Sequence, residues 1–261
     1  SSDLGVRLNG IAGAVYGIGG YFGTRFVNED LFNTAAGQSN TNTTDAPIMK
    51  LNEVLLNYLE AAAELNDMGA YTLSQKDLDI TINEIRKRAS VNMPAVTLSG
   101  KNFSVNGVII NDPDRDLGNS EVVGDYEVSP ILWEVRRERR IELVYEGIRF
   151  DDIRRWGKLH YADMKINKKL NLGAWLDKEA YLKEYNQANG TSYTIDDLKD
   201  ILLDREGNSG YIKPIQVSSL LRTYGEKDYL YPIPTGQISL YNSKSEQLGD
   251  SSIKLEQNPG W

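Results

Sequence analysis

The chain contains no cysteine and only one histidine, His160. Without cysteine it can form no disulfide, no zinc–thiolate site and no thiolate nucleophile. A single histidine excludes metal motifs that need two, such as HExxH. His160 follows an expected short helix, and we interpret it as a surface or structural residue. The sequence therefore lacks the side chains for thiolate chemistry and for histidine-rich metal sites.

Positive charge is scarce. The chain has 29 Lys and Arg against 37 Asp and Glu, which gives a net charge of −8. An acidic balance argues against a nucleic-acid-binding protein and against a protein that binds anionic membranes through a basic face. The longest Gly-rich apolar stretch, residues 10–23, is shorter than the ~20 residues that cross a bilayer. It also lacks the charged start and leucine-rich centre of a signal peptide. Because the first residue is Ser1, we expect a processed chain or a piece of a longer one.

Several catalytic and metal-binding motifs are incomplete. No GxSxG elbow occurs, and residues 17–22 fail GxGxxG because Phe22 takes the place of the last glycine. Carboxylates at positions 112, 114 and 116 have the spacing of a calcium loop. However, Leu117 and Val123 stand where an EF-hand needs glycine and glutamate, so we expect a solvated turn. We therefore predict no metal and no cofactor.

The chain is nevertheless long and apolar enough to fold around a core, because 40% of its 261 residues are hydrophobic. We divide it into three parts. Residues 1–46 form a Gly/Asn-rich loop segment, residues 47–160 a helical core, and residues 161–261 a loop-rich C-terminal part of the same domain.

Two neighbouring helices are predicted at the start of the core. Residues 49–66 carry apolar side chains at helical spacing, namely Leu51, Val54, Leu55, Tyr58, Ala62 and Leu65. Residues 75–89 repeat the pattern with Leu78, Ile82, Ile85 and Ala89. A short connection makes such helices pack antiparallel, as in one tetratricopeptide-type repeat. Residues 92–129 are predicted to be loop.

Further helices are predicted over residues 131–146 and 150–157, with shorter ones over residues 172–186 and 195–203. Prolines within residues 231–234 exclude helix there. No strong series of alternating strands is present. The predicted fold is therefore all-α, with tetratricopeptide-like helix pairs, long irregular loops and little or no regular sheet.

The turn between the helices at 131–146 and 150–157 contains Gly147, which permits a tight reversal of the chain. Such a reversal would fold the second helix back onto the first. We therefore expect the aromatic side chains of Phe150 and Trp156 to be buried against the helix at 131–146.

A row of glutamates marks the helix at 131–146. Their spacing is i, i+4, and they are Glu134, Glu138, Glu142 and Glu146. Like charges at this spacing destabilise a helix by about 0.2–0.5 kcal/mol per pair. We therefore expect at least two of them to pair with arginines of other segments, with Arg86, Arg88, Arg154 and Arg155 as the candidates. The alternative, the carboxylate pair of a glycoside hydrolase, is disfavoured because neighbouring arginines lower carboxylate pKa values and impair a general acid.

Tyrosine dominates the aromatic residues, with fifteen tyrosines against five phenylalanines. Aromatic faces stack on sugar rings while polar groups bind the hydroxyls. Tyr16, Tyr21, Phe22 and Arg25 lie together in the Gly-rich first segment. We predict that these four residues contribute to a ligand-binding surface, with packing between helix repeats as the alternative.

Four segments resemble the SusD/RagB family. They are WEVRRERRIEL at residues 133–143, EGIRFDDIRRW at 146–156, YLYPIP at 229–234 and QNPGW at 257–261. The helix at residues 51–61 resembles a further family segment, from which Asn52 and Leu59 depart. The matches come in the family's order from about residue 47 to the end of the chain.

This resemblance implies a surface lipoprotein of the outer membrane in Bacteroidota. Members lie over a SusC-type TonB-dependent transporter and help capture oligosaccharides or, in some branches, peptides. They have no catalytic activity. Members are much longer than this chain, so we expect it to be a C-terminal portion, without the lipidated cysteine that would provide its membrane association. The remaining alternatives are a peptide-capturing RagB-like protein, a helical-repeat scaffold that binds only protein and, least favoured, a glycoside hydrolase.

Overall fold

The computed structural model describes residues 29–31, 34–37, 43, 47–116, 127–213 and 221–261. This part of the chain is mostly helical, with one three-stranded and one two-stranded antiparallel sheet. The predicted fold class is therefore confirmed. Two short 3-10 helices, η1 (Glu29–Leu31) and η2 (Ala35–Gly37), precede the first α-helix.

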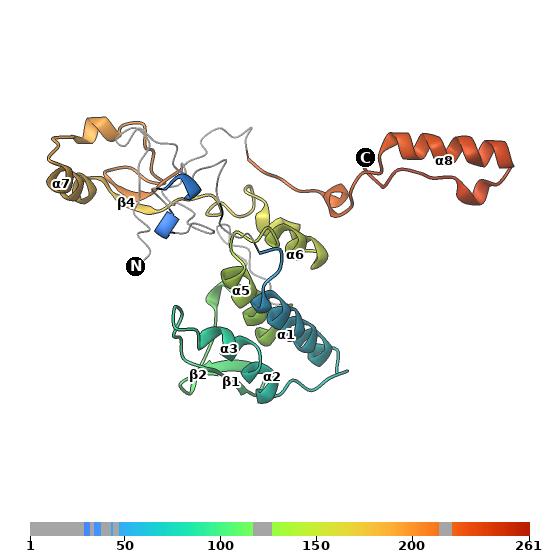
Figure 1. The fold of residues 1–261 in the computed structure, drawn as a ribbon, viewed down its shortest axis with the longest axis horizontal. Helices are drawn as coiled ribbons and strands as arrows, with labels where there is room; N and C mark the ends of the chain where they lie inside the picture. The colour runs from blue at the N-terminus through green and yellow to red at the C-terminus, as the bar shows by residue number, and fades with distance from the viewer. Residues whose placement is uncertain (1–28, 32–33, 38–42, 44–46, 117–126, 214–220) are drawn as a thin grey trace.

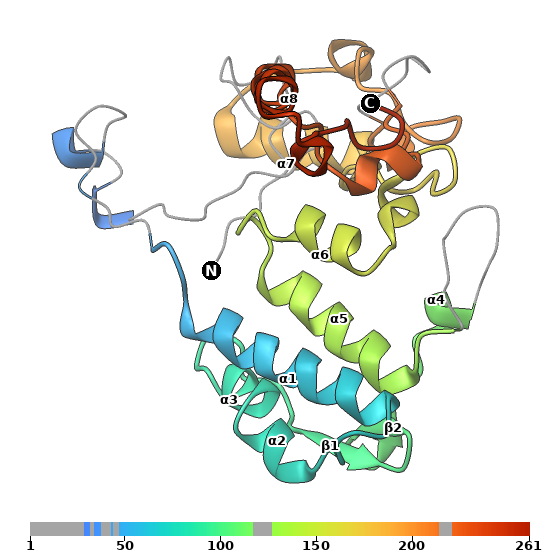
Figure 2. The same cartoon turned by 90° about the vertical axis from the view of Figure 1, so that its right-hand side faces the viewer.

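Helices α1 (Leu51–Asp67) and α5 (Pro130–Glu142) lie side by side and form the centre of the molecule (Figure 2). Their contact contains the small residues Ala62 and Ala63 of α1, which allow a close approach to Val135 of α5. All three are buried. The main apolar core is therefore built on this helix pair, and the elements that directly follow α1 in the chain lie below α1 in Figure 2.

The predicted apolar face of α1 is wrong at most positions. Ala62 is buried and Leu55 partly buried, but four members of the stripe are 44–71% exposed, namely Leu51, Val54, Tyr58 and Leu65. The buried residues of α1 are Leu56, Leu59, Glu60, Ala62 and Ala63. The cause is that polar side chains of α1 bind arginines of α5 and α6 (Arg149–Arg155). These polar side chains are Glu64, Asn57 and Glu60, and they occupy the face of α1 that meets the two helices.

The helix predicted over residues 75–89 is split into α2 (Gln75–Asp79) and α3 (Ile82–Arg86). The break lies at Thr81, whose backbone has φ −123° and ψ −98°. The Thr81 hydroxyl donates to the backbone carbonyl of Asp77 at 2.5 Å. Such a local bond competes with the helical pattern. Leu78, Ile82 and Ile85 are buried as the pattern predicts, whereas Ala89 is exposed beyond the helix.

A three-stranded sheet occupies part of the segment predicted to be loop, so that prediction is wrong. Its strands are β1 (Val96–Ser99), β2 (Asn102–Val105) and β3 (Val108–Ile109). The β2–β3 turn is Asn106-Gly107, with φ of +51° and +79°. Two positive φ angles define the type I′ turn, for which Asn-Gly is the preferred pair. A short helix, α4 (Pro113–Asp116), follows the sheet.

Helix α5 ends at Glu142, four residues earlier than predicted. Leu143 leaves the helix and is buried against Leu56 and Ile85. Tyr145 and Gly147 then adopt φ of +63° and +80°, and the chain turns into α6. The reversal at Gly147 is therefore confirmed.

The aromatic residues of α6 and its end are less buried than predicted. Phe150 is 39% exposed and contacts the ring of Tyr224 at 6.1 Å, so the prediction of its burial is wrong. Trp156 is half-buried, with the guanidinium of Arg136 4.5 Å from its ring centroid. A tryptophan that bonds through its indole N–H and stacks on a cation keeps one edge near solvent.

The C-terminal part has a second, smaller core. Strands β4 (Trp175–Asp177) and β5 (Ser209–Tyr211) pair antiparallel beside α7 (Lys178–Asn189). Their buried residues are Leu176, Leu182, Leu198 and Ile212. The remaining 3-10 helices are η3 (Leu159–Ala162), η4 (Ile195–Leu198), η6 (Glu226–Tyr229) and η7 (Ser251–Ile253). The helix predicted over 172–186 is thus shifted and shortened to α7, and the one predicted over 195–203 begins at residue 195 but is only the 3-10 helix η4.

Helix α8 (Thr235–Leu248) begins directly after Pro234, so residues 231–234 are non-helical as predicted. This helix was not predicted. It projects away from the other helices in Figure 1, and Ser245 is its one buried residue.

Asp77 joins the start of α2 to α1. One carboxylate oxygen accepts the hydroxyl of Tyr58 at 2.7 Å and that of Tyr71 at 3.0 Å. The other accepts the backbone N–H and the hydroxyl of Ser74 at 2.8 and 2.6 Å. Burial acts to raise the pKa of Asp77, but these bonds outweigh it and lower that pKa to about 2.

We predict that Asp77→Asn lowers the free energy of unfolding by about 1–3 kcal/mol at neutral pH, because it removes charge-assisted hydrogen bonds. The folded pKa lies below the ordinary value of 3.8, so the contribution is complete above about pH 4 and declines as pH falls toward 2. Urea unfolding of both proteins from pH 7 to pH 3 measures this. The exposed Asp67→Asn is the control. If the difference in unfolding free energy between the original protein and Asp77→Asn grows as the pH falls, the lowered pKa of Asp77 is contradicted.

Candidate functional site

A buried cluster of charges connects α1, α5 and α6. Arg139 donates from Nε to Asp152 Oδ2 at 2.7 Å, and its Nε lies 3.6 Å from Glu60 Oε2. Arg155 reaches Glu60 at 2.5 Å and Asp152 at 2.9 Å. Arg139, Glu60 and Asp152 are each at most 4% exposed. The indole N–H of Trp156 donates to the second oxygen of Glu60. Two arginines thus balance two buried carboxylates.

The glutamate row of α5 pairs as predicted with arginines outside its helix. Glu138 binds Arg86, and Glu142 binds Arg88 at 2.6 Å. Both arginines lie in or just after α3, so the pairs hold α3 against α5. The prediction that at least two members of the row pair in this way is confirmed.

The other two glutamates have different partners. Glu134 pairs within its own helix with Arg137 at 2.6 Å, and burial raises the pKa of Glu134 despite that arginine. Glu146 lies beyond the end of α5 and pairs with Lys50 at 3.0 Å. The expected candidate Arg154 instead donates to the backbone carbonyl of Tyr229. Two of the four glutamates, Glu138 and Glu142, therefore link α5 to the region of α3, and each glutamate of the row has a cationic partner among the described residues.

Two cavities of about 310 Å³ each lie beside the buried cluster. The first lies over α1 and α6 and is lined by Asn57, Glu60, Ala61, Glu64, Arg139 and Arg155. Its polar groups already bind one another, as the contact of Arg139 with Asn57 at 2.5 Å shows. This cavity therefore has few free polar groups for a ligand.

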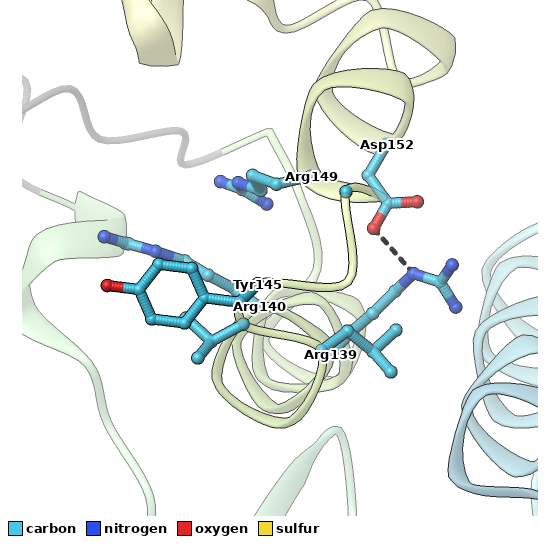
Figure 3. A pocket seen from close by; sticks show the side chains of 8 residues that line it. Arg139, Arg140, Tyr145, Arg149 and Asp152 are labelled. Atoms are coloured by element: carbon cyan, nitrogen blue, oxygen red, sulfur yellow. Dashed lines mark hydrogen bonds and ion pairs between the residues drawn. The ribbon is translucent and has the colours of Figure 1, made fainter. Parts of the chain in front are cut away.

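The second cavity lies where α5 turns into α6 (Figure 3). It is lined by Arg139, Arg140, Leu143, Val144, Tyr145, Gly147, Arg149 and Asp152. In Figure 3, Arg139 extends toward Asp152, whereas Arg140 and Arg149 extend to the side on which the Tyr145 hydroxyl lies. The side chains of the buried cluster thus form one wall, and the other wall presents an aromatic ring and two cations.

Tyr145 is the distinctive residue of this second cavity. It is 66% exposed, and its φ of +63° is unusual for a residue with a Cβ. Left-handed backbone costs such a residue about 1–2 kcal/mol, and such strain clusters at binding sites. An exposed aromatic face beside fixed hydrogen-bond donors is what a sugar ring requires. We therefore take this cavity as the candidate ligand-binding site.

The site residues predicted from the sequence, Tyr16, Tyr21, Phe22 and Arg25, lie outside the described residues and stay predictions. Tyr145 was missed, because the sequence pattern placed it inside a helix that in fact ends at Glu142. The signal that could have indicated it is the Tyr-Glu-Gly sequence at a helix end.

Within the described ranges, no three His, Asp or Glu side chains converge as metal ligands would. Asp112 directly precedes α4 and accepts the backbone N–H of Asp114 at 3.0 Å and the indole N–H of Trp133 at 2.9 Å, so its carboxylate binds protein groups. His160 packs edge-on against Tyr161 at 4.8 Å. No helix in the described residues is long and apolar enough to span a bilayer.

We predict that Arg139→Met lowers the free energy of unfolding by about 3–5 kcal/mol, because Glu60 and Asp152 would keep buried charges with less compensation. The matched control is Lys87→Met, which breaks the exposed pair with Glu84 and should lower the free energy of unfolding far less. Chemical denaturation at pH 7 measures both. Equal effects of the two substitutions on the free energy of unfolding would show that burial of the cluster does not strengthen its ion pairs.

Comparison with known proteins identifies the family. The family model described as the SusD family matches residues 16–261. Among solved structures, a SusD-like carbohydrate binding protein from Bacteroides fragilis is 31% identical, with a TM-score of 0.39, over 75% of this chain. The matched region is only 28% of that protein's chain. No curated protein matches. On the strength of the family match over almost its entire length, this chain belongs to the SusD family.

Proposed function

We propose that this chain is part of a non-catalytic cell-surface protein that captures oligosaccharides for a SusC-type TonB-dependent transporter of the outer membrane. The observation that carries the proposal is the SusD family match over residues 16–261. The name of the related Bacteroides fragilis protein, which is carbohydrate binding, supports a glycan as the ligand. A lipid anchor on a part of the protein outside this chain would hold it at the cell surface.

The geometry of the second cavity supports glycan binding. Tyr145 offers an exposed ring, and the adjacent arginines can donate hydrogen bonds to hydroxyl or charged groups. The buried cluster behind them holds the ends of α5 and α6 in place, so the site is built on fixed elements. The sequence-based proposal that Tyr16, Tyr21, Phe22 and Arg25 contribute to a ligand-facing surface stands beside this one.

The alternative ligand is a peptide, as in RagB-like members of the family. Parallel screens of an oligosaccharide array and a peptide library on the full chain separate the two. The proposal expects hits among oligosaccharides. Hits among peptides alone would replace it with peptide capture, and turnover of any oligosaccharide would overturn the non-catalytic assignment.

We predict that Tyr145→Gly weakens binding of the best oligosaccharide about two- to tenfold, since ring stacking contributes about 0.5–1.5 kcal/mol. Glycine accepts positive φ freely, so the melting temperature should change little. Tyr145→Phe keeps the ring face and is the matched control, with affinity close to that of the original protein. Calorimetric titration with thermal melts measures both quantities. Unchanged affinity in Tyr145→Gly would remove Tyr145 from the site.

A further inference from the structure

Besides Arg139, two arginines line the second cavity, one from α5 and one from α6. Arg140 lies in the last turn of α5, and Arg149 is the first residue of α6. Figure 3 shows both guanidinium groups extending to the same side of the turn as the Tyr145 hydroxyl. Two cations therefore approach one cavity from different elements.

Neither arginine has a carboxylate partner among the described residues. On the same helix, Arg136, Arg137 and Arg139 each bind one, at 2.9, 2.6 and 2.7 Å. Arg149 has only the ring of Trp156, 5.4 Å from its guanidinium carbon. Arg154 of α6 also has no carboxylate partner among the described residues, but it donates to the backbone carbonyl of Tyr229 and does not line this cavity.

Three acids near the cavity already bind other cations. Asp152, the one acid that lines the cavity, binds Arg139 and Arg155. Glu142 and Glu146, at the end of α5 and just after it, bind Arg88 and Lys50. Within the described residues, these three carboxylates therefore each have a cationic partner other than Arg140 and Arg149.

The resulting electrostatics favour an anion. Burial and the nearby charge of Arg140 lower the pKa of Arg149 to about 10, although the charge of Asp152 acts in the opposite direction. A bound anion would reverse the second of these effects. Guanidinium groups bind carboxylate and sulfate through two parallel hydrogen bonds, which gives strong and oriented contacts.

We propose that Arg140 and Arg149 form a binding site for the carboxylate or sulfate group of an acidic sugar, whose ring stacks on Tyr145. This inference rests on the proposed capture of glycans and names their class as acidic. A cavity of about 310 Å³ is large enough for one charged sugar unit. The arginines supply the charge selectivity, and the tyrosine supplies the face for the ring.

The test uses small probes, so it does not require the natural ligand. Glucuronate and inorganic sulfate are titrated into the full chain, with glucose as the neutral control, and the arginine side-chain Nε signals are followed by NMR. We expect glucuronate and sulfate, but not glucose, to shift the signals of Arg140 and Arg149. Arg140→Gln and Arg149→Gln should each weaken glucuronate binding about tenfold, the loss expected for one charge-assisted contact.

Lys183→Gln, an exposed position on α7, is the charge-matched control and should leave glucuronate binding unchanged. Arg149→Lys keeps the charge but loses the two-pronged contact, and should bind glucuronate less tightly than the original protein. A merely structural role predicts lower melting temperatures in the glutamine variants. The anion site predicts that Arg140→Gln melts no lower than the original protein, because it relieves repulsion.

Equal responses to glucose and glucuronate, or glucuronate binding that survives both glutamine variants, would overturn the site. Tighter binding of a glutamate-rich peptide than of a glucuronate-containing oligosaccharide at these arginines would overturn the sugar assignment.

The proposed function, glycan capture, can fail independently of the anion site. If neutral oligosaccharides bind and neither glutamine variant changes their affinity while glucuronate fails to bind, the anion site is wrong and glycan capture stands. If glucuronate binds at the arginines but no oligosaccharide does, the anion site is supported and glycan capture is wrong.

Discussion

The pairing of Arg139 with the buried carboxylate of Asp152 is the constraint on which the rest of the structure depends. A carboxylate and a guanidinium removed from water are tolerated only when their remaining hydrogen-bonding groups are also satisfied. Glu60, Asn57 and Arg155 meet that requirement, and they come from α1 and α6. The cluster therefore fixes three helices relative to one another. It also explains why α1 presents polar residues to its partners and leaves several apolar side chains exposed.

The same constraint links the fold to the candidate site. Arg139 and Arg140 are neighbours in sequence, but their side chains extend in different directions from the end of α5 (Figure 3). Arg139 binds Asp152 within the buried cluster, whereas Arg140 faces the cavity with Arg149 and Tyr145. Because α6 is held through Asp152 and Arg155, the turn between the two helices has fixed ends. The left-handed backbone of Tyr145 is thereby maintained in a position that presents its ring to solvent.

Predictions from the sequence were confirmed where the spacing of residues within one helix was sufficient. The i, i+4 spacing of glutamates required external cations, and Arg86 and Arg88 provide them. The predictions were wrong where contacts between distant segments determine which residues are buried and where helices end. The binary pattern of α1 assumed that apolar residues face inward, and no local rule indicates that Glu60 is buried. At the break, the Thr81 hydroxyl donates to the backbone carbonyls of Asp77 and Leu78, and the apolar pattern gives no sign of these contacts. The β2–β3 turn, in contrast, was predictable from Asn106-Gly107 and was overlooked, and the end of α5 depends on the burial of Leu143 among residues distant in sequence.

The most direct test of this account is a double-mutant cycle on Arg139 and Asp152, measured as free energies of unfolding. Arg139→Met and Asp152→Leu are made singly and together. If the pair organises the helices, each single variant strands a buried charge and the double variant removes both. The double variant should then be more stable than the sum of the single effects predicts, with a coupling of about 1–3 kcal/mol. Additive effects, within about 0.5 kcal/mol, would show that the two residues act independently and would contradict the account.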